Sequence, residues 1–412
     1  MVSVSRRSLI ALGAALPLLG RLDWAVAAPP PAKTDTVLLN YNESPYGPSQ
    51  AARAAMQQGI ATSGRYPYKH MYALARLFAQ QQGIAEEQVA VFAGSMAALR
   101  YAVLAFTSEQ RGLVMATPSY EVPREAAESN KAPVLEVNLN ADHAHDVPAM
   151  LAANPHAGML YLCNPNNPTG TVTPVDAIGQ ALANKPKGSV LVVDEAYIDF
   201  ADVPSVVSWV KDHDDLMVLR TFSKIYGMAG ARLGLAVGHP DLLARLAVFG
   251  GDNVPAGSSL LAGLASLEDI KLLPQRKALN QQLRDETIAW LQGRGFTCTT
   301  SEANCFMIDV KQPAQQVVER LTRHGVEVGR VWKNWPQWVR VTVGNKQEMA
   351  RFREVFAAQV VGIDRHNADQ HVGGGLPPIA VGQLLVSWLI PLSGASPLPH
   401  LSCGVGYCCA ML

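Results

Sequence analysis

A serine and a lysine stand just beyond the end of an apolar segment of this chain. The segment Leu216–Leu219 reads LMVL, which is typical of a buried strand, and Ser223 and Lys224 follow shortly after it. A glycine-rich turn then leads to Arg232. Ligands of α/β proteins bind at the carboxyl ends of strands, where a buried lysine can lose its proton and attack a carbonyl. Because Ser223 and Arg232 supply donors for a phosphate, the stretch predicts a phosphate-bearing carbonyl ligand on Lys224 rather than an ordinary surface lysine.

The composition is that of a globular chain large enough for two domains. Its 412 residues are 49% hydrophobic and 17% charged, and the formal net charge is zero. This balance gives no indication of binding to nucleic acid or to an anionic membrane surface. Beyond the N-terminal segment no uncharged apolar run is long enough to span a bilayer, so we expect no stable membrane association.

Two more strand ends carry residues suited to the same ligand. The segment Val89–Phe92 is followed by Gly94, Ser95 and Met96 at a predicted helix start, where free amides can bind a phosphate, although a Gly-Ser pair is often only a helix cap. The apolar segment Val190–Val193 is followed by an aspartate, which is costly to bury unless it is paired; the alternative is a helix N-cap. The alternation of strands and helices over residues 66–250 predicts a mostly parallel, doubly wound sheet.

The segment Ser223–Gly234 resembles the cofactor-lysine segment of fold-type I pyridoxal-phosphate aminotransferases, in particular histidinol-phosphate aminotransferase and its relatives. The motifs NYNESPYGP at 40–48 and NPNNPTG at 164–170 extend the similarity, which runs from about residue 38 to about residue 361. The resemblance implies an α/β fold-type I transferase. Its large domain would hold the mostly parallel sheet, and a smaller α+β domain would follow.

The resemblance also implies a role for each motif residue. Lys224 would bind pyridoxal 5′-phosphate covalently and move the substrate's α-proton, while Asp194 would pair with the pyridine nitrogen. Asn167 and Tyr197 would contact the cofactor's O3′, and Tyr120 would stack on its ring. The phosphate would be bound by Gly94, Ser95, Met96, Ser223, Arg232 and, from the neighbouring subunit of a homodimer, Tyr66.

Three residues are candidates for the substrate. Arg340 stands in a strand made otherwise of Val and Thr, and the resemblance assigns it the substrate α-carboxylate; the alternative is an edge-strand charge. Asn42 would lie beside the substrate. Arg330 is displaced by one position from the family's Gly-x-x-x-Arg pattern, and the upstream tyrosine of histidinol-phosphate enzymes has no counterpart. We therefore expect a general amino-acid donor with a 2-oxo acid acceptor, and histidinol phosphate is the alternative.

Two other classes of function stay open. A pyridoxal-phosphate decarboxylase or other lyase of the same fold would share every cofactor residue. A non-catalytic exported binding protein would also be a two-domain α/β protein, although Lys224 and its phosphate donors argue against it. We expect no metal site, because the run DHAHD at 142–146 lies in a connecting segment with no third ligand cluster.

The chain divides into five predicted parts. Residues 1–27 read as a signal peptide, 28–65 as a linker with the N-terminal segment of the small domain, 66–250 as the large cofactor-binding domain, 251–361 as the small C-terminal domain and 362–412 as an atypical tail without predicted function. Arg6 and Arg7 precede an apolar run and the small residues Ala25–Ala27. This pattern predicts recognition by the twin-arginine (Tat) machinery and a periplasmic or exported protein; the alternative is a Sec signal with a chance arginine pair.

Replacing both Arg6 and Arg7 by lysine should trap a folded, cofactor-loaded precursor in the cytoplasm. The Tat route reads the arginine pair itself, whereas a Sec signal needs only the positive charge that lysine keeps. Cell fractionation with N-terminal sequencing measures the outcome. Normal processing of the double-lysine variant would assign the signal to the Sec route.

Overall fold

The computed structural model describes residues 36–250 and 254–361, which lie in one compact unit. The predicted signal peptide and the tail from residue 362 lie outside these described residues. The described chain builds two hydrophobic cores. None of its helices is both long and apolar enough to cross a bilayer.

The first core is built around a seven-stranded sheet with the strand order β2-β8-β7-β6-β5-β3-β4. Its strands are β2 (Val89–Phe92), β3 (Leu113–Thr117), β4 (Val134–Asn138), β5 (Met159–Cys163), β6 (Val190–Asp194), β7 (Leu216–Thr221) and β8 (Gly234–Gly238). Only β8 runs antiparallel to its neighbours. The strands β5, β6 and β7 are buried throughout, as expected for apolar runs covered on both faces. The predicted mostly parallel α/β sheet is therefore confirmed.

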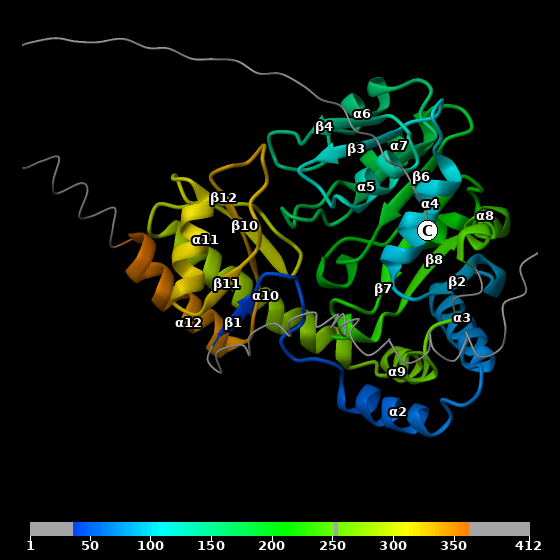
Figure 1. Ribbon diagram of the computed structural model, residues 1–412, viewed down its shortest axis with the longest axis horizontal. Helices are drawn as coiled ribbons and strands as arrows, with labels where there is room; N and C mark the ends of the chain where they lie inside the picture. The colour runs from blue at the N-terminus through cyan, green and yellow to red at the C-terminus, as the bar shows by residue number, and fades with distance from the viewer. Residues whose placement is uncertain (1–35, 251–253, 362–412) are drawn as a thin grey trace, which may run out of the picture. The chain divides into compact units, whose positions relative to one another are not determined.

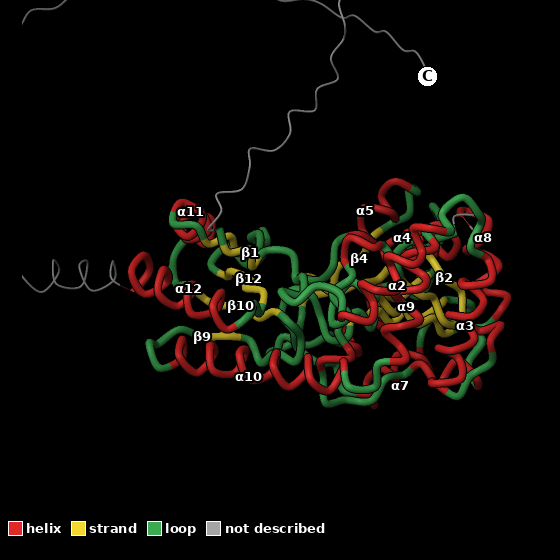
Figure 2. The backbone as a smooth tube through the Cα atoms, turned by 90° about the horizontal axis from the view of Figure 1, so that it is seen from below, coloured by secondary structure: helices red, strands yellow, loops and turns green. Residues whose placement is uncertain are grey.

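Helices cover both faces of this sheet. They are α3 (Tyr68–Gln82), α4 (Ser95–Phe106), α5 (Val122–Ser129), α6 (Val147–Ala153), α7 (Val175–Asn184) and α8 (Pro240–Gly250), with short turns η1 (Glu86–Gln88), η2 (Ile198–Phe200), η3 (Val207–Lys211) and η4 (Ala229–Ala231). On one face, α4 packs against α5 and α8, and α7 lies on the other face (Figure 2). Helix α6 packs against α7.

The second core combines segments from both ends of the described chain. It contains β1 (Val37–Leu39), β9 (Thr297–Cys298), β10 (Cys305–Asp309), β11 (Val326–Val328) and β12 (Trp338–Thr342), with α10 (Leu272–Gln292), α11 (Ala314–Arg323), α12 (Lys346–Phe356) and η5 (Ala357–Val361). The strands β12, β10 and β9 form an antiparallel sheet. The strand β1 pairs in parallel with β11, so two segments almost 290 residues apart in the sequence, Val37 and Val326, lie side by side (Figure 1).

Helix α2 (Gln50–Ala61) packs on α9 (Gly257–Glu268), and both lie against the first core (Figure 1). A Cβ at Gly59 would lie 2.5 Å from the Cα of Ser258, so glycine permits this close approach. The sequence instead predicts that residues 28–65 and 251–361 belong with the small domain. That division stays a prediction; in the structure, Ala52 of α2 and Leu260 of α9 are buried in the first core.

Candidate active site

A cavity of about 870 Å³ lies at the carboxyl ends of β6 and β7. Of the residues predicted to bind cofactor or substrate, all except Gly94 and Tyr66 line it. The lining residues are Asn42, Ser95, Met96, Tyr120, Asn167, Asp194, Tyr197, Ser223, Lys224, Arg232, Arg330 and Arg340. The strands of the first core thus bring together side chains that are far apart in the sequence.

Lys224 is partly buried and follows the last residue of β7 by three positions. Its Nζ donates to the main-chain oxygen of Tyr41 at 3.1 Å and lies 5.6 Å from the centre of the Tyr197 ring. Burial, with the positive charge of Arg340 as a second cause, lowers the pKa of Lys224 from 10.5 to about 8. A lysine in this state is available as a neutral amine near physiological pH.

Asp194 ends β6 and is only 4% exposed. Its Oδ2 accepts from the Tyr161 hydroxyl at 3.0 Å, and its Oδ1 accepts from the Ala196 amide at 3.1 Å. Burial raises the pKa of Asp194 to about 6 against the lowering effect of these donors. The sequence reasoning missed Tyr161. Tyr161 pairs in register with Val192, which shares a face with Asp194, and this register is known only from the folded sheet.

The phosphate donors gather where α4 begins. A Cβ at Gly94, which has a φ of +90°, would lie 2.5 Å from Nη2 of Arg232, and a Cβ at Gly234 would lie 2.2 Å from the Ser95 amide nitrogen. Glycine is therefore required for the arginine and the helix start to come together. The hydroxyl of Ser223 accepts from Thr221 at 3.0 Å, which leaves its own hydrogen for a ligand.

Asn167 and Tyr197, the two residues predicted to contact O3′, each accept one hydrogen bond from a protein side chain, as Ser223 does. Asn167 accepts from Nη1 of Arg340 through Oδ1 at 2.8 Å, which leaves its amide hydrogens toward the cavity. Tyr197 accepts from Asn42 through its hydroxyl oxygen at 3.1 Å. With a cationic and amide donor set for phosphate, a buried carboxylate and a lysine of lowered pKa, these residues fit pyridoxal 5′-phosphate.

Arg340 and Arg330 enter the cavity from the second core. Arg340 is 7% exposed, and besides its bond to Asn167 its Nη2 donates to the main-chain oxygen of Asn40. Its buried Nε has no hydrogen-bond partner within the described part of the chain. Arg330 forms an ion pair with Glu121, a partner that the sequence reasoning missed. Both guanidinium groups face the Trp332 ring, at 5.1 Å for Arg330 and 5.4 Å for Arg340.

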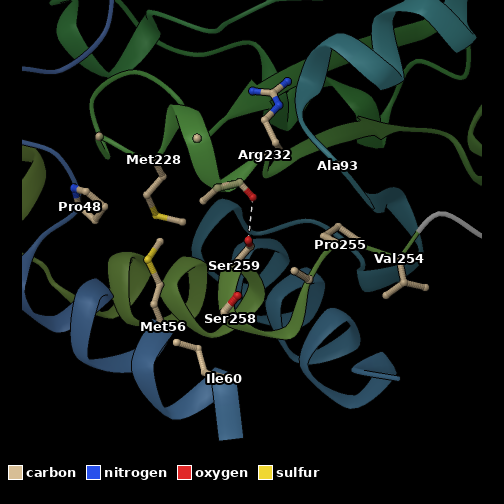
Figure 3. A pocket seen from close by; sticks show the side chains of 14 residues that line it. Pro48, Met56, Ile60, Ala93, Met228, Arg232, Val254, Pro255, Ser258 and Ser259 are labelled. Atoms are coloured by element: carbon tan, nitrogen blue, oxygen red, sulfur yellow. Dashed lines mark hydrogen bonds between the residues drawn. The ribbon is translucent and has the colours of Figure 1, made fainter. Parts of the chain in front are cut away.

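A second cavity of about 750 Å³ adjoins the first (Figure 3). The two share Gly230 and Arg232, and Met56, Ile60 and Met228 line the second one. Tyr66 lines neither cavity and is 84% exposed, so within its own protomer it contributes nothing to the site.

The histidines of the DHAHD run have other contacts. His143 packs edge-on against Trp335 and Trp338, and the buried His145 bonds through Nδ1 to the Thr173 hydroxyl at 2.9 Å. Within residues 36–250 and 254–361, no group of three or more potential ligand side chains could hold a metal ion.

The fold and the donor set define a fold-type I pyridoxal-phosphate-dependent enzyme. The chain matches the family "Aminotransferase class I and II" over residues 34–356. It is 36% identical over 327 residues to a histidinol-phosphate aminotransferase of Symbiobacterium thermophilum, covering 79% of this chain and 90% of the relative. It is 35% identical over 333 residues to histidinol-phosphate aminotransferase 1 of Nitrosococcus oceani, covering 78% and 88%.

The fold is also that of a solved histidinol-phosphate aminotransferase from Sinorhizobium meliloti in complex with pyridoxal 5′-phosphate. The TM-score is 0.73 at 23% identity, and the match covers 81% of this chain and 91% of the other. The chain therefore belongs to the aminotransferase class I and II family, and it is a pyridoxal-phosphate-dependent aminotransferase. This decides between the transaminase, lyase and binding-protein classes that the sequence left open.

The rate at which cofactor-free protein captures pyridoxal phosphate should rise with pH and level off above a midpoint near 8. The capture needs neutral Lys224, whose pKa is lowered to about 8, so the reactive form accumulates as the pH rises through that value. Stopped-flow absorbance measures the rate, and Lys224→Ala should show no covalent uptake at any pH.

The same experiment tests the contribution of Arg340 to the lowered pKa. Arg340→Leu removes a positive charge that disfavours protonated Lys224, so the midpoint should move upward, whereas the exposed Arg323→Leu should leave it in place. A wild-type midpoint at the ordinary lysine value would contradict the assignment.

Proposed function

We propose that this aminotransferase takes the amino group of histidinol phosphate and transfers it to a 2-oxo acid. The proposal replaces the general amino-acid donor that the sequence favours, and the names of the relatives support it. The observation that carries it is the presence of two arginines, Arg330 and Arg340, in the wall of the cavity that contains Lys224.

Two guanidinium groups suit a phosphate monoester better than a carboxylate. A phosphate monoester carries about two negative charges near neutral pH, whereas a carboxylate carries one. Arg340 is buried with an unpartnered Nε, which is costly until an anion supplies the acceptor. Arg330 is 55% exposed in its side chain, and its partners among the described residues are Glu121 and the Trp332 ring, so it can turn toward the second charge of a phosphate.

The remaining residues supply the chemistry of transamination. When bound, pyridoxal phosphate supplies an electron sink for the substrate carbon that loses its proton. Asp194 places a buried negative charge where the resemblance puts the pyridine nitrogen, and Lys224 is positioned to take the proton and return it.

A homodimer is part of the proposal. Dimers are typical of this family, and Tyr66 is almost fully exposed beside Tyr68, with their ring centres 5.9 Å apart. Ile60 and Tyr72 are exposed as well, at 67% and 55%. The cavity of Figure 3 borders Arg232, which makes it a route by which a neighbouring subunit's side chain reaches the phosphate site.

Export of the folded protein stays a proposal that rests on Arg6 and Arg7. The Tat route carries folded cargo, which agrees with a protein that must first bind its cofactor. A histidine-pathway substrate would be out of place beyond the cytoplasm, so the substrate and export proposals are in tension. Their tests are independent of each other.

Steady-state kinetics with three donors tests the substrate proposal. The wild-type enzyme should prefer histidinol phosphate to histidinol, which lacks the phosphate, and to histidine, which has a carboxylate instead. Arg340→Ala should lower kcat/KM about 30- to 1000-fold for every anionic substrate, since one charge-assisted contact is worth about 2–4 kcal/mol. Arg340→Lys keeps the charge but loses the two-pronged donor, so it should also fail substantially.

Arg330→Ala separates the phosphate from the carboxylate. It should lower kcat/KM for histidinol phosphate about 10-fold or more and leave kcat/KM for histidine with 2-oxoglutarate nearly unchanged, because Arg330 contacts the second negative charge of the phosphate. Equal use of histidinol phosphate and histidinol by the wild-type enzyme would overturn the proposed substrate and leave the aminotransferase class intact.

Subunit mixing tests the dimer. Tyr66→Ala should weaken pyridoxal phosphate binding, and Lys224→Ala should abolish covalent binding. When the two variants are mixed and refolded together, half of the sites in the mixed dimers regain both residues, so covalent binding at low cofactor concentration should reappear. No recovery in the mixture would place Tyr66 outside the neighbouring site.

A further inference from the structure

Asn42 forms hydrogen bonds to other protein residues through both its side-chain amide and its main chain. It is 1% exposed and has a φ of +54°, the left-handed region that a non-glycine residue seldom adopts. Its amide nitrogen Nδ2 donates to the Tyr197 hydroxyl at 3.1 Å and to the Cys305 sulfur at 3.2 Å. Its main-chain oxygen accepts from Asn304 at 3.0 Å.

Thr342 decides which end of the Asn42 side chain faces Tyr197. The Thr342 hydroxyl accepts from the main-chain nitrogen of Asn42 at 3.0 Å and donates to its Oδ1 at 3.1 Å. A hydroxyl has a single hydrogen, and that hydrogen is used on Oδ1. The amide oxygen of Asn42 is therefore fixed on Thr342, and only its NH₂ group is left for Tyr197.

This orientation determines what the Tyr197 hydroxyl can do. Its oxygen already accepts a hydrogen bond from Asn42, and its own hydrogen has no acceptor among residues 36–250 and 254–361. Tyr197 lines the cavity, where the resemblance places the cofactor's O3′. The Tyr197 hydroxyl therefore keeps its hydrogen for the cofactor, because Asn42 already supplies a hydrogen bond to its oxygen.

The backbone of Asn42 has a second effect, on Lys224. The left-handed turn follows directly after Tyr41, whose main-chain oxygen accepts from Nζ of Lys224 at 3.1 Å. Asparagine tolerates this left-handed conformation better than other non-glycine residues, and its neighbours hold it there. The bonds to Thr342 and Asn304 impose it here.

We propose that Asn42 is a positioning residue that turns the Tyr197 hydroxyl hydrogen toward the cofactor and keeps the Tyr41 carbonyl on Lys224, rather than a residue that binds substrate. Thr342 maintains its orientation from β12, the strand that also carries Arg340. The proposal holds whichever amine the enzyme takes, because no contact in it involves the amine substrate.

Two substitutions of Asn42 separate its amide from its backbone. Asn42→Asp has the same shape, but its carboxylate accepts the Tyr197 hydrogen and turns it away from the cofactor. Asn42→Gly adopts the left-handed conformation without strain and loses only the amide. The readouts are the dissociation constant of pyridoxal phosphate and the pH titration of the bound cofactor's absorbance, neither of which needs turnover.

Asn42→Asp should weaken cofactor binding about tenfold, the size of one lost hydrogen bond, and raise the midpoint of the absorbance titration. Asn42→Gly should shift the titration less and leave the pH midpoint of capture by Lys224 unchanged. In a Tyr197→Phe background, Asn42→Gly should add nothing further, since its effect on the titration passes through the hydroxyl. Thr342→Ser keeps the hydroxyl and should preserve the titration.

Three results would overturn the proposal. The first is an unchanged titration in Asn42→Asp together with a raised KM for the amino donor, which would make Asn42 a substrate ligand. The second is full additivity of Asn42→Gly and Tyr197→Phe. The third result concerns Thr342→Val, which is the variant to use if the Asn42 variants fail to fold. This variant keeps Asn42 but removes the hydroxyl that orients its amide, so an absorbance titration identical to that of the wild-type protein would overturn the proposal.

Discussion

The burial of the Arg340 guanidinium is the constraint on which the site depends. A charge in this position must be surrounded by acceptors, and Asn167, the main-chain oxygen of Asn40 and the face of Trp332 surround it. These contacts join the second core to the first across the cavity. They also fix the amide of Asn167 with its hydrogens toward the ligand, and the positive charge helps to lower the pKa of Lys224. The Arg340 guanidinium thus orients Asn167 and lowers the pKa of Lys224 from a single position in the cavity wall.

The site could be predicted from sequence where its residues have a local signal. Asp194 comes directly after the apolar run Val190–Val193, and Ser223 and Lys224 come shortly after Leu216–Leu219. Ser95 begins a helix after a glycine, so the places of these residues at one edge of a parallel sheet follow from the pattern. Tyr161, Glu121 and Thr342 could not be found in this way. Their contacts depend on neighbouring strands or on the approach of the second core, which no local pattern records.

The fold was predictable to a similar degree and for a similar reason. Alternating apolar and amphipathic segments indicate a mostly parallel sheet, whereas the core that α2 and α9 join depends on surface that forms only after folding. The one-position displacement of Arg330 from the Gly-x-x-x-Arg pattern did not predict the location of its side chain, for the same reason. The segment after β11 leaves the strand at Val328, so counting positions from Gly325 does not determine where the side chain lies, and Arg330 lines the cavity.

The bond between Asn42 and Thr342 joins residues 300 positions apart in the chain. During translation, the segments that carry Lys224 and the phosphate donors leave the ribosome well before β12 does. The nascent chain therefore has a partial pocket in which neither Tyr41 nor Tyr197 is fixed. Pyridoxal phosphate can be bound in its final geometry only after β12 has folded, so a chain that ends before β12 lacks the contacts that position Tyr41 and Tyr197.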